Sequence, residues 1–134
     1  MNGYGNVANG NGRRAFKLMI VDDSNIMRRR IERSQQSEEL ELIGTAGNGV
    51  EAIELFRKMD PDVVTMDLTM PQMDGIECIS QLVQMKPAIR ILVISALADK
   101  ATAVEAMEKG ANGFLNKPFT DRQLNEAIAD LIRE

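Results

Sequence analysis

Residues 63–75 read VVTMDLTMPQMDG, and this stretch predicts the centre of the fold. Val63–Met66 is a short apolar and β-branched run, which is typical of a strand buried in a parallel sheet. Pro71 and Asp74–Gly75 then favour a turn, and apolar residues at helical spacing begin directly after them. Asp67 is therefore expected at the carboxyl end of a buried strand, where open α/β sheets place their ligands.

The composition limits the class of protein. A length of 134 residues suffices for one domain that folds without disulfides. The net charge of −4 and a pI near 5.0 provide no basic footprint, so we expect no direct DNA binding. The absence of His and the single Cys78 exclude His-dependent triads, His and Cys metal sites and an internal disulfide. Without a bilayer-spanning apolar run or a signal-type segment, we expect a cytoplasmic protein without membrane insertion.

Hydrophobic periodicity predicts strands that alternate with helices along the whole chain. The expected strands are 17–21, 40–46, 63–66, 89–94 and 113–116. Helices are expected over 24–36 and 98–109, after Asn48–Gly49, after Gly75, and after Thr120, which forms a capping-box pattern with Gln123. Such alternation predicts an α/β domain with a parallel sheet and helices on both faces.

The sequence also predicts the character of the first residues, the orientation of the first helix and the end of the fourth. Residues 1–15 are rich in Gly and Asn and predict a flexible tail before a domain over 16–134. In the helix 24–36, the expected inward side chains are Ile26, Met27 and Ile31, and the expected outward ones are Arg28, Arg29, Arg30 and Arg33. Gly110 is expected to cap the helix 98–109.

Polar groups follow four of the five expected strands. They are Asp22 with Asp23, Asp67, Ser95 and Lys117. Because the carboxyl ends of parallel strands meet at one edge of a sheet, we expect these side chains to converge. Carboxylates gathered within about 4 Å repel one another, so the site needs positive charge from Lys117 and a divalent ion. An oxygen-only ligand set favours Mg²⁺.

This combination suits phosphoryl chemistry. One carboxylate attacks phosphorus, the cations neutralise the phosphoryl oxygens, and a hydroxyl donates a hydrogen bond. The alternative interpretation is that the Asp and Ser residues merely cap helices, which is plausible for any single one of them and much less so for the whole set.

The motifs resemble the receiver domain of two-component response regulators. They are Asp22–Asp23 after LMIV, Asp67 in TMDLTMPQMDG, Ser95–Ala96 after ILVI and Lys117–Pro118–Phe119 after GANGFLN, and the match covers residues 17–133. The resemblance implies a doubly wound, flavodoxin-like (βα)5 domain with strand order 2-1-3-4-5.

The resemblance also implies roles for residues of this chain. Asp67 is the implied phosphoacceptor, Asp23 binds Mg²⁺ directly, Asp22 binds it mainly through water, and the backbone carbonyl of Thr69 is a further ligand. Lys117 pairs with the phosphoryl group, and its bond to Pro118 is cis. The implied switch residues are Ser95 and Phe114. The positions implied to tune the lifetime of the phosphoryl group are Thr69 and Leu97. For Phe114, a permanently buried core ring stays an alternative.

The implied donor is a phosphohistidine on a histidine kinase or phosphotransfer protein. If the chain ends naturally at Glu134, the output is binding to another protein, through a face with Ala101, Val104, Phe114 and Leu115. Similarity to stand-alone chemotaxis receivers favours a flagellar motor switch or a phosphatase as target. A phosphate shuttle or sink, a phosphorylation-independent adaptor and a fragment of a larger regulator stay open.

A true phosphatase is a weaker alternative. Haloacid dehalogenase-like hydrolases also use Asp, Mg²⁺, Ser or Thr, and Lys around an aspartyl phosphate. They place the nucleophile in an Asp-x-Asp pattern after the first strand, whereas this chain has the adjacent Asp22–Asp23 there. We therefore expect a signalling module rather than an enzyme with an external substrate.

Overall fold

The computed structural model describes residues 15–96 and 99–133. The strands are β1 (Phe16–Val21), β2 (Leu40–Ala46), β3 (Val63–Met66), β4 (Arg90–Ser95) and β5 (Gly113–Asn116). The helices are α1 (Asn25–Ser34), α2 (Gly49–Met59), α3 (Gly75–Met85), α4 (Lys100–Glu108) and α5 (Asp121–Arg133). The alternating order agrees with the prediction. The predicted strand and helix ends differ from the observed ones by at most two residues.

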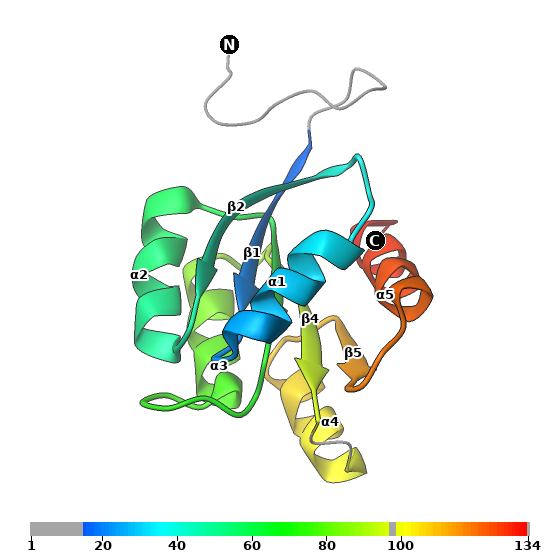
Figure 1. The fold of residues 1–134 in the computed structure, drawn as a ribbon. Helices are drawn as coiled ribbons and strands as arrows, with labels where there is room; N and C mark the ends of the chain where they lie inside the picture. Colours follow the sequence, from blue (N-terminus) through cyan, green and yellow to red (C-terminus); the bar gives the residue numbers. More distant parts are fainter. Residues whose placement is uncertain (1–14, 97–98, 134) are drawn as a thin grey trace.

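The strands form one parallel sheet in the order β2-β1-β3-β4-β5, which confirms the doubly wound α/β fold (Figure 1). The order reverses between β1 and β3, where the chain first moves to one side and then to the other. In such a sheet, ligands bind beyond the carboxyl ends of the strands at this reversal. Asp22 and Asp67 follow the two strands concerned.

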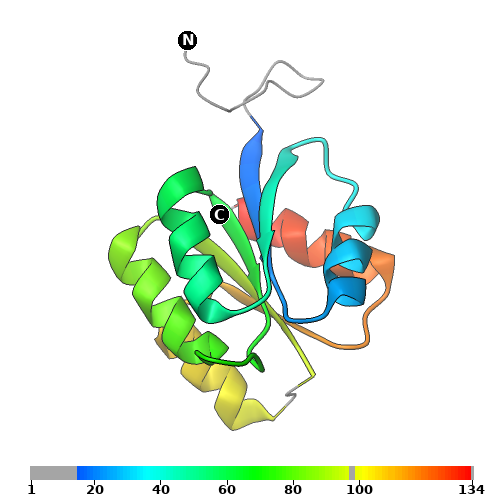
Figure 2. The same ribbon diagram turned by 60° about the vertical axis from the view of Figure 1, so that its left-hand side comes forward.

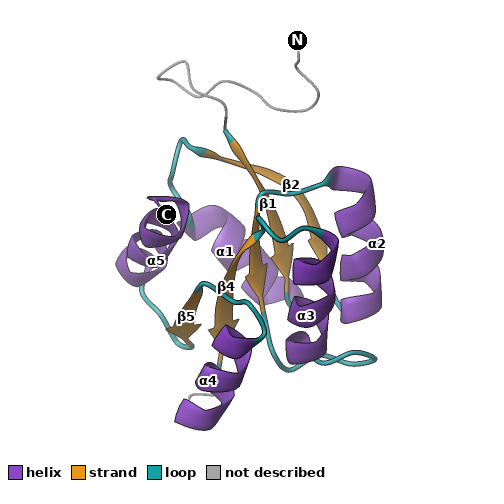
Figure 3. Ribbon diagram, turned by 180° about the vertical axis from the view of Figure 1, so that it is seen from behind, coloured by secondary structure: helices purple, strands orange, loops and turns teal. Residues whose placement is uncertain are grey.

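Helices cover both faces of the sheet, as Figures 2 and 3 show. The core beneath α1 and α5 includes Leu18, Ile20, Ile31, Leu92, Leu124 and Ile128. The core beneath α2, α3 and α4 includes Met19, Val21, Phe56, Ile79, Val93 and Ala106. Adjacent residues of β1 thus enter opposite cores, which explains why the strand reads as a continuous apolar run.

Two local signals at helix ends are confirmed. Thr120 and Gln123 form the predicted capping box, since each backbone N–H donates to the other's side chain, at 2.9 and 3.0 Å. Gly110 follows α4 with a φ of +118°, a conformation that favours glycine. Its N–H donates to the carbonyl of Met107, and the chain turns toward β5.

The predicted orientation of the first helix is partly wrong. Ile31 is buried and Met27 is half-buried, but Ile26 is 78% exposed. Met27 and Ile31 are four residues apart and lie on the face toward the sheet, which turns Ile26 away from it. Two of the arginines predicted to face outward, Arg28 and Arg30, are instead half-buried.

Some expectations fall outside the described residues. The segment 1–15, predicted to be flexible, lies outside the described residues except for Ala15, which is buried. Leu97 also lies outside them. Cys78 packs in the core as expected, and burial raises the pKa of its thiol to about 12. Within the described parts of the chain, every helix is too short or too polar to cross a bilayer.

Candidate functional site

Asp22, Asp23 and Asp67 meet at the carboxyl edge of the sheet, as predicted. Their carboxylate oxygens lie within 4.8 Å of one another. Asp22 and Asp67 are buried, at 1% and 5% exposure, whereas Asp23 is exposed. Two acids thus form the floor of the site and one lies at its mouth, which is the arrangement of a site that opens to solvent on one side.

Backbone hydrogen bonds hold the two buried acids in place. The Asp22 N–H donates to the Ala46 carbonyl at 3.0 Å, and the Asp67 N–H donates to the Val21 carbonyl at 2.9 Å. These bonds continue the parallel ladders beyond the last strand residues. The site therefore rests on the ends of β1 and β3, each of which lies between two neighbouring strands of the sheet.

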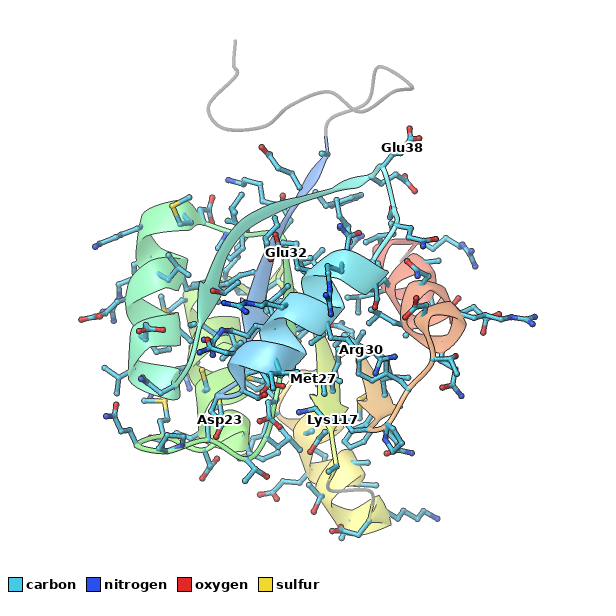
Figure 4. All side chains as sticks on the ribbon, viewed as in Figure 1. Asp23, Met27, Arg30, Glu32, Glu38 and Lys117 are labelled. Carbon is cyan, nitrogen blue, oxygen red and sulfur yellow. The ribbon has the colours of Figure 1, made fainter. Side chains whose placement is uncertain are left out.

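Lys117 brings the positive charge that the acids require. Its ammonium lies 2.8 Å from Oδ2 of Asp22 and 3.6 Å from Oδ1 of Asp67. Figure 4 shows Lys117 and Asp23 at the same end of the sheet. The Lys117 N–H donates to the Ser95 carbonyl at 2.9 Å, and the bond between Lys117 and Pro118 is cis, as predicted.

The electrostatics of Asp67 differ from those of a surface carboxylate. Burial raises the pKa of Asp67 above its usual value, and the nearby Asp22 raises this pKa further. The Lys117 charge and the Thr69 N–H, which lies 3.4 Å from Oδ1, act in the opposite direction. The site thus lacks positive charge for its three carboxylates, and this favours binding of a cation.

The donor set fits Mg²⁺. It consists of carboxylate oxygens alone, with solvent access at Asp23, and Mg²⁺ is bound in proteins through one or two carboxylates with retained water. Thr69 lies on the loop that follows Asp67, next to the acids. Its carbonyl as a further ligand stays a prediction.

The predicted switch residues share one side of the sheet. Ser95 is fully buried at the end of β4, and Phe114 on β5 pairs with Val93, which lies two residues before Ser95. Side chains two residues apart on a strand point to the same face. Phe114 is half-buried against the core beneath α2, α3 and α4. A switching role for this ring stays a prediction.

The loop from Leu68 to Gly75 depends on a close approach that the sequence analysis missed. A Cβ atom on Gly75 would lie only 2.4 Å from the Asp67 carbonyl oxygen. The Gly75 N–H donates to the Leu68 carbonyl at 3.0 Å, which brings the start of α3 against the end of β3. Gly75 was predicted only as a turn residue, because its neighbours in space are not visible in the sequence.

The comparisons with known proteins agree with this geometry. A family model of the response regulator receiver domain matches residues 18–129. The chain belongs to the receiver family of response regulators. The receiver is 38% identical over 113 residues to the chemotaxis protein CheY of Listeria monocytogenes, covering 84% of this chain and 95% of that protein. It is 36% identical to CheY of Halobacterium salinarum, covering 88% and 98%.

Longer proteins and solved structures also match. A protein-glutamate methylesterase/protein-glutamine glutaminase of Pseudoalteromonas atlantica is 44% identical over 119 residues, which cover 86% of the receiver and 31% of that protein. A chain in the crystal structure of the CheX–CheY–BeF3–Mg²⁺ complex from Borrelia burgdorferi has a TM-score of 0.83 and 32% identity, covering 87% and 89%. The response regulator domain of Thermotoga maritima CheB has a TM-score of 0.78 and 33% identity, covering 90% and 95%.

Proposed function

We propose that this receiver accepts a phosphoryl group on Asp67 and signals through binding that depends on this phosphorylation. The observation that carries the proposal is the position of Asp67, which is 5% exposed, among two further carboxylates and 3.6 Å from the Lys117 ammonium. A nucleophile with a cation beside it suits a reaction in which negative charge accumulates on phosphoryl oxygens.

In the proposed reaction, an oxygen of the ionised Asp67 attacks phosphorus and forms a new O–P bond. The bond from phosphorus to the donor breaks, and its electron pair leaves with the imidazole of a phosphohistidine on a histidine kinase or phosphotransfer protein. Lys117 holds a phosphoryl oxygen, and the Ser95 hydroxyl donates to another. Asp22, Asp23, Asp67 and the Thr69 carbonyl would hold Mg²⁺, which neutralises charge on the phosphoryl group when it is bound.

The output is proposed to lie on the face formed by α4, β5 and α5. Phosphorylation would draw Ser95 toward the phosphoryl group and favour the conformer in which Phe114 turns inward. Exposed apolar side chains occur there, since Val104 and Met107 of α4 are 46% and 44% exposed. Similarity to chemotaxis proteins supports a chemotaxis role. We propose that the protein acts in the cytoplasm and that its target is a flagellar motor switch or a phosphatase.

The experiment that tests the proposal is intact-mass measurement after incubation with acetyl phosphate, with and without Mg²⁺. We expect one phosphoryl increment that requires the metal and is absent from Asp67→Asn. Asp74→Asn is the matched control, because Asp74 lies on the same loop. Its side chain caps α3 by accepting a hydrogen bond from the Glu77 N–H, and an asparagine side chain can accept the same bond. If the wild-type chain takes up no phosphoryl group, or Asp67→Asn takes it up equally, the proposed acceptor is wrong.

The lifetime of the aspartyl phosphate forms a second part of the proposal. Thr69 presents neither a carboxylate nor an amide that would orient an attacking water, so we expect moderately slow self-dephosphorylation. Loss of the mass increment after removal of acetyl phosphate measures this lifetime. A lifetime of only seconds would contradict the expectation.

A further inference from the structure

The arginines of α1 divide into two kinds. Arg29 and Arg33 are exposed, whereas Arg28 and Arg30 are half-buried and reach loops that carry site residues. Arg28 donates from Nη1 to the Asp22 carbonyl at 2.5 Å, and Arg30 donates from Nη2 to the Phe119 carbonyl at 2.5 Å. The inward pair thus links α1 to the Asp22 backbone and to the loop that follows Lys117.

Arg30 makes three interactions with the start of α5 and the loop before it. Besides donating to the Phe119 carbonyl, its guanidinium lies 4.5 Å from the centroid of the Phe119 ring and 3.6 Å from Oδ1 of Asp121. Figure 4 shows Arg30 on the side of α1 that faces β5 and the chain after it. A planar guanidinium can lie flat on the ring and donate at the same time, whereas a lysine ammonium is a compact point charge without a planar face.

These interactions add a polar anchor in the middle of the β5–α5 loop, beside the packing of Phe119 in the core. At one end, the Lys117 N–H is bonded to β4 through the Ser95 carbonyl. At the other end, the Thr120–Gln123 capping box begins α5. Between them lies Phe119, which is 4% exposed in the core beneath α1 and α5 and whose carbonyl accepts from Arg30.

The packing of α5 against α1 has a separate support. Asn125 donates from Nδ2 to the Ser34 carbonyl at 2.8 Å, and its Oδ1 accepts from the Gln36 N–H at 2.8 Å. These bonds join the far end of α1 to α5, whereas Arg30 acts near Lys117. Loss of the Arg30 guanidinium should therefore loosen the loop without undocking α5.

We propose that Arg30 is a positioning residue of the phosphorylation site, which fixes the β5–α5 loop through Phe119 and so aims the Lys117 ammonium at Asp22 and Asp67. The link to phosphorylation rests on the function proposed above. The positional effect itself concerns only residues of the chain and is present without metal or phosphodonor.

The first test is the ¹H–¹⁵N NMR signal of the Lys117 ammonium in metal-free protein, since a buried, ion-paired ammonium exchanges its protons slowly. The signal is assigned with Lys117→Met. We expect Arg30→Met to shift or broaden it, and Arg30→Lys to restore it only in part. Arg29→Met is the matched control on the exposed side of α1 and should leave the signal unchanged. Asn125→Ala should lower stability and also leave it unchanged.

The second test is phosphorylation by acetyl phosphate. We expect Arg30→Met to lower the maximal rate by about tenfold or more, up to the roughly hundredfold loss that a 1 Å misplacement can cause. An unchanged Lys117 signal in Arg30→Met would overturn the positioning role. So would an equal change in Asn125→Ala, because general loosening would then explain both. If the wild-type chain takes up no phosphoryl group, the proposed function fails, while the NMR result still decides the role of Arg30.

Discussion

The Lys117 ammonium lies 2.8 Å from Oδ2 of Asp22, and this contact joins residues 95 positions apart. Lys117 is thus closer to Asp22 than to Asp67, from whose Oδ1 it lies 3.6 Å. Asp22 is 1% exposed, so the ammonium and the Ser24 N–H, which lies 2.9 Å from Oδ1, take the place of water around its carboxylate. A phosphoryl group on Asp67 would compete with Asp22 for the Lys117 ammonium. A cation bound at the acids would neutralise Asp22 in place of Lys117.

We expect Lys117→Met to lower the free energy of unfolding by about 3 kcal/mol at neutral pH, because it leaves buried Asp22 without its cation. Urea unfolding monitored by circular dichroism measures the change. Mg²⁺ should restore part of the lost stability, since it binds the same carboxylates. Lys86→Met is unsuitable as a control because Lys86 also bridges two acids, so exposed Lys100→Met serves instead. A Lys117→Met protein as stable as wild type would contradict the prediction.

Asp67→Asn should stabilise the metal-free protein at neutral pH, by about 1 kcal/mol on the scale of single substitutions. The raised pKa means that the folded protein holds the ionised Asp67 at a cost relative to the unfolded chain. Below the usual carboxyl pKa, Asp67 is protonated in both states, so the gain should disappear as the pH falls. Urea unfolding between pH 3 and pH 8 tests both the sign and the trend.

Addition of Mg²⁺ should have a different effect on the stability of wild type and of Asp67→Asn. It should stabilise wild type more than Asp67→Asn, because the variant lacks one of the three carboxylates. A variant that is less stable than wild type at neutral pH without metal would show that Lys117 outweighs burial and Asp22 at this position.

Gly75→Ala should destabilise the protein by about 2–3 kcal/mol, in the range for overpacked sites. The new Cβ would meet the Asp67 carbonyl oxygen at 2.4 Å and the Leu68 Cα at 2.6 Å, so backbone must move. We also expect slower phosphorylation by acetyl phosphate. Gly113→Ala is the control, because the nearest atom there is the end of the Leu92 side chain at 3.2 Å. Equal stability of Gly75→Ala and wild type would contradict the close packing.

Thr65→Val should raise the free energy of unfolding by about 1 kcal/mol. Thr65 is 1% exposed in β3 between Ile20 and Leu92, and its hydroxyl has no hydrogen-bond partner among the described residues. Valine has nearly the same shape without the polar atom, so the burial cost is removed. Thermal unfolding checks the sign, with exposed Thr45→Val as the control. A lower melting temperature would indicate that the hydroxyl finds a partner in solution.

Much of the site was predictable from the sequence because parallel strands bring their carboxyl ends together. Asp22, Asp67 and Lys117 each follow a recognisable apolar run, and the parallel sheet brings them together at one edge. The roles of Arg28 and Arg30 could not be predicted in this way. Four arginines in one helix look alike in sequence, and which two turn inward depends on the packing of α1 against the sheet and on loops far along the chain.

The sequence by itself determined the alternation of strands and helices, the two-sided burial of the sheet and the chemical type of the site. These follow from local hydrophobic periodicity and turn residues, which act over a few positions. Only the tertiary structure decided that Lys117 pairs first with Asp22, that Gly75 must touch Asp67, and that Arg30 holds the loop at Phe119. Such distances depend on how separate elements pack, and contacts across 89 or 95 positions leave no periodic signal in the chain.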